Sequence, residues 1–261
     1  MKRVFKSDTV FLLSFFLIVI GIGTFLLLLP AAWAGNPGRP FRLSPVDALF
    51  TSTSAVCVTG LTTVDTADFS RFGQLVILGL IQVGGLGIVS FTSFMLLLPG
   101  GRLPFRRLRT IRSFSVQGVE NDPFRILRSI VVSTFLIEVL GAAALAVQFA
   151  GLGHAEPVFL GVFHAVSAFC NAGFSVFPDS LERFKGEPAL LGTFSVLIVT
   201  GGIGFIVLQD IARRIRGKKR ILSYHSRLML SITAVLVLTA AAVFWLLEKD
   251  HAFAGMSGLD R

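Results

Sequence analysis

Two eight-residue stretches of this chain share the residue types that a loop needs to turn its backbone carbonyl oxygens toward one point. Ser54–Leu61 reads SAVCVTGL, and Ser167–Phe174, which begins 113 positions later, reads SAFCNAGF. The Ser, Ala, Cys and Gly are identical in the two copies. Glycine allows backbone conformations that direct successive carbonyls toward one axis, where they can replace the water shell of a cation. The repeat therefore predicts two copies of one pore-lining hairpin.

A short helix is predicted before each of these loops. Ser44-Pro45-Val46-Asp47 has the pattern of a helix start, and Glu156-Pro157 opens the second helix in a similar way. The apolar segments Val46–Cys57 and Val158–Cys170 are too short to cross a bilayer, and apolar runs of about 10–14 residues are typical of re-entrant or buried helices. Their C-terminal ends carry partial negative charge, which favours a cation at the loop, and Thr59 can add a hydroxyl oxygen.

Longer apolar runs frame both hairpins. The chain has 261 residues and is 53% hydrophobic but only 15% charged, whereas soluble domains are usually about 25% charged. Five runs reach the length of about 20 residues that a bilayer requires. They are Val10–Leu29, Phe72–Leu98, Ile130–Ala150, Ala189–Gln209 and Leu228–Leu247. We therefore predict an all-α integral membrane protein of about five spanning helices and two re-entrant pore helices.

The order of these segments predicts a repeated organisation. Residues 1–100 form a first span–pore helix–loop–span unit, and residues 101–125 form a cytoplasmic linker. Residues 126–216 form the second unit, and residues 217–261 contain the first span of an incomplete third unit. Span, pore helix, filter loop and span in repetition is the arrangement expected of a potassium-channel-like pore.

Glycine clusters recur in the second span of each unit. Gln82–Gly87 reads QVGGLG, and Thr200–Gly204 reads TGGIG. A nucleotide-binding loop would follow a strand and face water, whereas both clusters lie inside uncharged apolar runs. They predict close helix packing or a bend beside the pore.

The basic residues are distributed unevenly along the chain. The net charge is +9, and most of the 24 Lys and Arg residues fall within Lys2–Lys6, Arg102–Arg128 and Arg213–Arg227. Placing these three segments inside satisfies the positive-inside rule and puts the N-terminus in the cytoplasm. The basic excess thus indicates membrane topology rather than nucleic-acid binding. The outer face is left slightly acidic, which raises the local concentration of cations.

Few residues could support catalysis. Glu138 is a charged residue in the middle of the third apolar run, where it is either a functional group for ions or a partner for a neighbouring helix. Cys57 and Cys170 occupy equivalent points of the repeats, as packing residues or, alternatively, as a disulfide or metal pair. The four histidines lack metal-binding spacing. We predict no enzyme activity, no catalytic residue and no metal site beyond a potassium filter.

Three segments carry a resemblance to a known family. Ser54–Asp65, Gln82–Gly87 and His164–Phe174 resemble the Trk/Ktr/HKT superfamily of potassium transporters, and the likeness is strongest to the Ktr-type membrane subunit, with the TrkH-type next. In that superfamily four units surround one pore, and one glycine from each sets potassium selectivity. The resemblance implies that Gly60 and Gly173 are the first two filter glycines. Their filter neighbours would be Val58, Thr59, Leu61, Asn171, Ala172 and Phe174.

The resemblance also implies a function and partners. It implies potassium uptake across the plasma membrane, with K⁺ as the transported ion and Na⁺ as a coupling or activating ion. A homodimer, a cytosolic nucleotide-binding regulatory subunit and membrane lipid are the implied partners, and the basic segment Arg213–Arg220 could face that subunit. Glycine at both visible filter positions favours potassium, because serine at the first position accompanies sodium permeation in the superfamily.

The chain departs from the superfamily pattern in the number of its loops. It contains two filter loops instead of four and lacks the gating segment of the third unit. We therefore expect a chain that is truncated at its C-terminal side. Two alternatives to potassium uptake stay open, namely a half-protein without transport activity of its own and a sodium-permeable relative.

Overall fold

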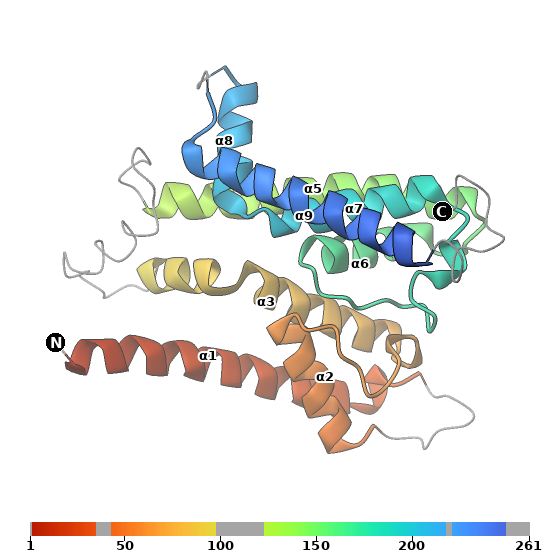
Figure 1. Cartoon of the computed structure of the whole chain (residues 1–261). Helices are drawn as coiled ribbons and strands as arrows, with labels where there is room; N and C mark the ends of the chain where they lie inside the picture. The colour runs from red at the N-terminus through yellow and green to blue at the C-terminus, as the bar shows by residue number, and fades with distance from the viewer. Residues whose placement is uncertain (1, 35–42, 98–122, 218–220, 249–261) are drawn as a thin grey trace.

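The computed structural model describes residues 2–34, 43–97, 123–217 and 221–248, and helices dominate them (Figure 1). No residue in these ranges belongs to a strand, although one isolated backbone bridge joins Trp33 to Phe69. The described part of the chain thus agrees with the predicted all-α class. Most of the predicted linker over residues 101–125, residues 218–220 of the basic segment and the tail after residue 248 lie outside the described ranges.

The first half places one short helix between two long ones. These are α1 (Lys2–Leu28), α2 (Pro45–Cys57) and α3 (Arg71–Leu97). The short helix α2 begins at the predicted cap, where Ser44 Oγ accepts a hydrogen bond from the Asp47 backbone N–H at 3.1 Å. This bond satisfies one of the N–H groups that the first helical turn leaves without a partner.

The second half has a similar order of helices. It contains α5 (Pro123–Gly151), α6 (Pro157–Phe169), α7 (Pro188–Gly202) and α8 (Phe205–Ile215). The short helix α6 begins directly after Glu156, as predicted, with a proline in its first turn. Figure 1 shows α3 and α5 lying beside each other where the two halves meet.

The fourth predicted span, Ala189–Gln209, is not one continuous helix. The structure ends α7 at Gly202 and begins α8 at Phe205, and the two segments are bent by 107°. Gly204 has a φ of 85°, a left-handed conformation that glycine adopts without a steric penalty. Gly87 in α3 also leaves helical geometry, with a φ of 46°. Both glycine clusters therefore contain the predicted bends.

Two of the described helices can cross a bilayer by length and apolarity, Arg128–Gly151 and Tyr224–Leu247. The bent pair α7 and α8 makes a third if it is counted as one span. Leu13–Leu28 and Arg71–Gly87 are apolar helices of shorter length. These helices agree with an integral membrane protein, and the number of five spans stays a prediction.

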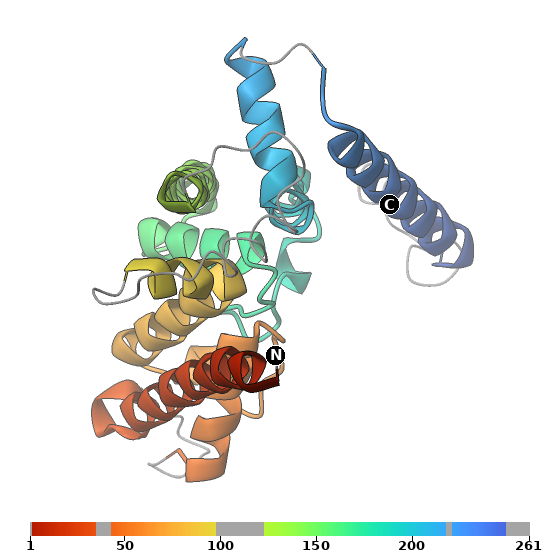
Figure 2. The ribbon, with the colours of Figure 1, turned by 90° about the vertical axis from the view of Figure 1, so that its left-hand side faces the viewer.

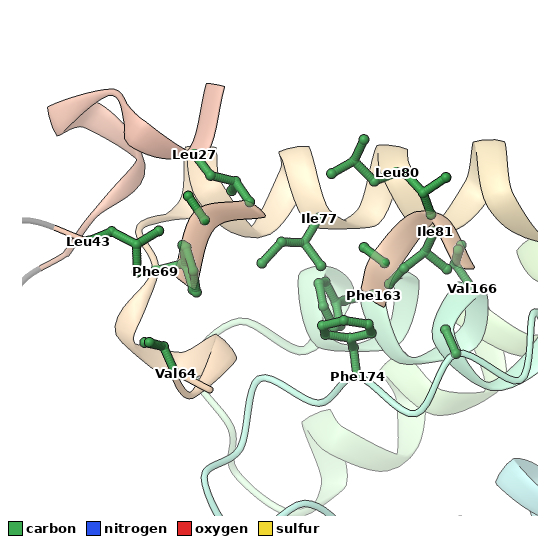
Figure 3. Packing of buried hydrophobic residues seen from close by; sticks show 14 residues of the cluster. Leu27, Leu43, Val64, Phe69, Ile77, Leu80, Ile81, Phe163, Val166 and Phe174 are labelled. Atoms are coloured by element: carbon green, nitrogen blue, oxygen red, sulfur yellow. The ribbon is translucent and has the colours of Figure 1, made fainter. Parts of the chain in front are cut away.

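The two halves share a hydrophobic core. Its larger cluster joins Leu27 of α1, Ile77 of α3 and Phe163 of α6, and Figure 3 shows Phe174 packed beside Phe163 in the same group. A second cluster lies among α5, α6 and α7 and includes Leu197. Because the first cluster contains side chains from both halves, the two predicted filter loops are held against one common core.

The last helix, α9 (Tyr224–Glu248), stands apart from the others in Figure 2. Its apolar segment is exposed along its length. The start of α9 is attached to α8 through Asp210, whose Oδ2 accepts hydrogen bonds from the Ser223 N–H at 2.6 Å and from the Ser226 hydroxyl at 2.8 Å.

Candidate functional site

Both predicted filter loops begin with the same turn at the end of a short helix. Val58 after α2 and Asn171 after α6 each have a φ of 57°, the left-handed conformation that commonly terminates helices. The next backbone N–H in each loop donates to the carbonyl of the first serine of its stretch, from Thr59 at 3.0 Å and from Ala172 at 2.7 Å. The sequence repeat is therefore a repeat of backbone structure.

The two predicted filter glycines face each other. Gly60 and Gly173 have φ values of 70° and 72°. A Cβ atom added to Gly60 would lie 2.6 Å from the Ala172 carbonyl oxygen and 3.1 Å from the Gly173 Cα. One added to Gly173 would lie 3.3 Å from the Gly60 Cα. The backbone conformation favours glycine at both positions, and at Gly60 the available space also excludes a Cβ atom.

A buried serine in each short helix forms a hydrogen bond with the loop that follows the helix. Ser54 Oγ lies 2.9 Å from the Thr59 hydroxyl, and the Ser167 hydroxyl donates to the Phe174 carbonyl oxygen at 2.6 Å. These side-chain bonds were not predicted, because they depend on how the loop closes over the helix end. The contact with Ser54 fixes the position of the Thr59 hydroxyl, and its predicted role as an oxygen ligand for an ion stays a prediction.

The eight candidate filter residues differ in exposure. Ala172 and Phe174 are buried, whereas 62% of the Leu61 surface is exposed. The other exposed positions are Thr59, Asn171 and Gly173, and those of intermediate exposure are Val58 and Gly60. The Phe174 side chain anchors its loop in the shared core. Gly173 and Leu61 are thus exposed at the surface, whereas Ala172 and Phe174 are packed in the interior.

Glycines of the following spans allow the ends of the short helices to approach closely. A Cβ at Gly84 in α3 would collide with the Val56 carbonyl oxygen at the end of α2. A Cβ at Gly201 in α7 would collide in the same way with the Phe169 carbonyl oxygen at the end of α6. The predicted close packing of the glycine clusters is confirmed, and it occurs directly behind each loop.

Asn171 ties the second loop to the neighbouring helix. Its Nδ2 donates to the Ile198 carbonyl oxygen in α7 and to the Phe169 carbonyl oxygen, both at 3.3 Å. The equivalent residue of the first loop, Val58, cannot form such bonds. The second loop is therefore fixed to its own unit by a side chain that the first loop lacks.

His164 is a structural residue that the sequence did not assign. It is 1% exposed within α6, its Nδ1 lies 2.9 Å from the Leu160 carbonyl oxygen, and its Nε2 lies 3.1 Å from the Ser175 hydroxyl. Its ring stacks on Phe177, with centroids 5.1 Å apart. The bond to Ser175 supports the chain just after the second filter glycine. The only indication of this role in the sequence is that His164 is a single histidine within an apolar short segment.

The loop after the second filter stretch, which contains Asp179 and Arg183, is anchored to the same aromatic group. Arg183 Nε donates to both carboxylate oxygens of Asp179, at 2.7 and 2.9 Å. These hydrogen bonds lower the pKa of Asp179, because they favour its charged form. The Arg183 guanidinium lies 4.9 Å from the centre of the Phe177 ring, which connects the loop to the support beneath it.

Glu138 lies between the halves of the molecule. Gln82 Nε2 of α3 is 3.1 Å from each of its carboxylate oxygens, and Cys170 Sγ is 3.9 Å from Oε1. These contacts favour the interpretation of Glu138 as a partner for neighbouring helices. Cys57 and Cys170 are both free thiols. Within the described ranges, no group of three metal-ligating side chains occurs.

Comparison with known proteins gives a family and several relatives. The family model described as "TrkH: Cation transport protein" matches residues 1–249. The Ktr system potassium uptake protein B of Bacillus subtilis is 37% identical over 184 residues, which cover 70% of this chain and 40% of that relative. The protein of the same name from Vibrio alginolyticus is 34% identical over 211 residues, which cover 80% and 46%.

A third relative carries sodium in its name. The potassium/sodium uptake protein NtpJ of Enterococcus hirae is 36% identical over 184 residues, which cover 69% of this chain and 40% of that relative. The chain therefore spans less than half the length of each of these three proteins.

Proposed function

Because the chain belongs to the TrkH family of cation transport proteins, we propose that it supplies two filter loops to a pore for potassium uptake. The observation that carries this proposal is the contact between Gly60 and Gly173, each one residue beyond the hydrogen-bonded turn that ends a short helix. In this proposal the stretches Val58–Leu61 and Asn171–Phe174 contribute backbone oxygens to one ion pathway. The transported ion is K⁺, which is also named in the relatives from Bacillus and Vibrio.

The physical basis is the replacement of ion hydration by fixed dipoles. A cation entering the filter loses water, and backbone carbonyl oxygens held by the fold can substitute for it. The C-terminal ends of α2 and α6 add partial negative charge beside the loops. Glycine at both contact positions keeps side chains from filling the path. The hydrogen bond from the Ser167 hydroxyl to the Phe174 carbonyl oxygen fixes the end of the second stretch.

The cellular setting follows from family and charge. The protein is a plasma-membrane transporter subunit with a cytoplasmic N-terminus, and its acidic outer loops attract cations. Its proposed partners are a second copy of the chain, membrane lipid and a cytosolic nucleotide-binding regulatory subunit. The words "Ktr system" in the names of two relatives support only a transporter of several components. Sodium enters either as an activating ion or as a permeant ion, since one relative is named for both cations.

The proposal is tested by growth of a potassium-uptake-deficient bacterium at limiting potassium. Two forms are compared, namely the chain alone and a hybrid in which it replaces the aligned segment of the Bacillus subtilis relative. We expect the hybrid to restore growth and ⁸⁶Rb⁺ uptake. If the hybrid restores growth and the chain alone does not, the chain functions as part of a pore that needs the remaining segments of the relative. A hybrid that is present in the membrane and inactive would contradict the proposal.

A further inference from the structure

Glu138 connects three elements at a single point. It belongs to α5, its carboxylate accepts from Gln82 of α3, and Cys170 Sγ lies 3.9 Å from its Oε1. Its surface is only 4% exposed. The partners that the described residues offer to this carboxylate, an amide and a thiol, are both neutral.

The thiol that contacts Glu138 has little freedom to move. Cys170 is the cap residue directly after α6 and precedes Asn171, the first residue of the second filter loop. On its other side, a Cβ added to Gly85 of α3 would collide with Cys170 Sγ. The position of Cys170, and with it the start of the loop, is therefore set by the packing of α3 and α5.

The first loop has a different environment. Its corresponding cysteine, Cys57, is exposed, whereas Cys170 is partly buried against Glu138. A buried acid is costly in a membrane, and an apolar side chain would fill the same space at lower cost. The presence of an acid at position 138 is explained if its hydrogen bonds fix the relative positions of α3 and α6.

We propose that Glu138 is a positioning residue that joins Gln82 to Cys170 and so sets the second filter loop against the first. This inference rests on the proposed function, because position matters here through its effect on the ion path. Asn171 holds the loop to α7 on one side, and the Glu138 cluster holds it to α3 on the other. The oxygens of Glu138 act as hydrogen-bond acceptors, and its charge is not required for this role.

The test uses the hybrid transporter described above and distinguishes the hydrogen-bond acceptors of Glu138 from its negative charge. Glu138→Gln keeps an oxygen that can accept from Gln82, and Glu138→Leu removes it. We expect Glu138→Gln to retain the discrimination between K⁺ and Na⁺ in competitive uptake. Glu138→Leu should reduce this discrimination by up to about tenfold, a factor within the range of one lost hydrogen bond between uncharged groups. Gln82→Leu should act similarly, and the double variant should add little to either.

A matched control and a second measurement separate positioning from general stability. Gln148→Leu removes another amide of α5, whose Nε2 donates to Thr193 at 3.0 Å within the second half, and it should leave ion discrimination unchanged. In membranes containing the chain with Cys57→Ser, maleimide labelling of Cys170 should accelerate in Glu138→Leu but not in Gln148→Leu. This labelling does not depend on transport.

Each outcome decides between specific possibilities. Equal loss of discrimination in Glu138→Gln and Glu138→Leu would overturn the positioning role in favour of a role for charge. Reduced abundance with unchanged discrimination and unchanged Cys170 labelling would reduce Glu138 to a packing residue. An inactive wild-type hybrid would instead refute the proposed function, and the labelling result would still test the contact.

Discussion

Gly60 and Gly173 are the residues at which an added side chain should have the largest effect on ion preference. Gly60→Ser places a Cβ near the Ala172 oxygen and forces a left-handed conformation that costs a non-glycine residue roughly 1–2 kcal/mol. We expect the preference for K⁺ over Na⁺ to fall about tenfold, since 1.4 kcal/mol corresponds to that factor. Competitive ⁸⁶Rb⁺ and ²²Na⁺ uptake by the hybrid measures the change.

Gly192 provides the matched control for this substitution. It is exposed on α7, and a Cβ there would have no neighbour within 4 Å. Gly192→Ser should therefore leave the ion preference as in the wild type. Unchanged relative fluxes in Gly60→Ser would show that the first loop has been assigned to the wrong place.

The sequence predicted the glycine pair but not the bonds that hold it. The identical spacing of Ser, Ala, Cys and Gly predicted two equivalent loops, and the backbone at Val58 and Asn171 is equivalent. The contacts of Ser167 and His164 require the loop to fold back over α6. Such contacts depend on tertiary geometry, for which residue types and spacing carry no direct signal.

At the scale of helices, the glycines behind the loops set how closely two elements can pack. Gly84→Ala and Gly201→Ala each introduce a methyl group against a carbonyl oxygen at the end of a short helix. Overpacking of this kind costs on the order of 1–3 kcal/mol. We expect both variants to lower the midpoint of thermal unfolding of the purified protein in detergent.

Gly79→Ala is the control on the same helix as Gly84. It introduces a methyl group where no atom lies within 4 Å, and alanine favours a helix over glycine by up to about 1 kcal/mol. Its unfolding midpoint should be equal to or higher than that of the wild type. Equal midpoints for all three alanine variants would argue against close packing at Gly84 and Gly201.

Hydropathy predicted which segments are helical, but it did not predict the positions at which a helix bends. The short helices α2 and α6 begin at the predicted Ser44 and Glu156 positions, because proline and capping residues determine a helix start locally. Hydropathy marks Ala189–Gln209 as one apolar run, and the structure bends it by 107° between α7 and α8, within the glycine cluster for which the sequence predicted close packing or a bend. Composition alone cannot distinguish a glycine that packs from one that bends.

For the whole molecule, the placement of basic residues predicts the orientation in the membrane. The end of α8, with Arg213, Arg214 and Arg216, should face the cytoplasm, and the loop containing Asp179 should face outside. Alkaline phosphatase fused after Gly186 should be active, and the same enzyme fused after Gly217 should be inactive. The reverse pattern would invert the topology and with it the proposed direction of uptake.

Because the two glycines are in contact, a substitution in one filter loop affects the other loop, although the two are far apart in the sequence. Any side chain gained at Gly60 presses on Ala172 and Gly173, more than a hundred positions away. Changes at neighbouring sites are not additive, so a replacement tolerated in one loop depends on what the other loop contains. The two stretches are similar in sequence, but their direct contact means that a substitution in one changes which residues fit in the other.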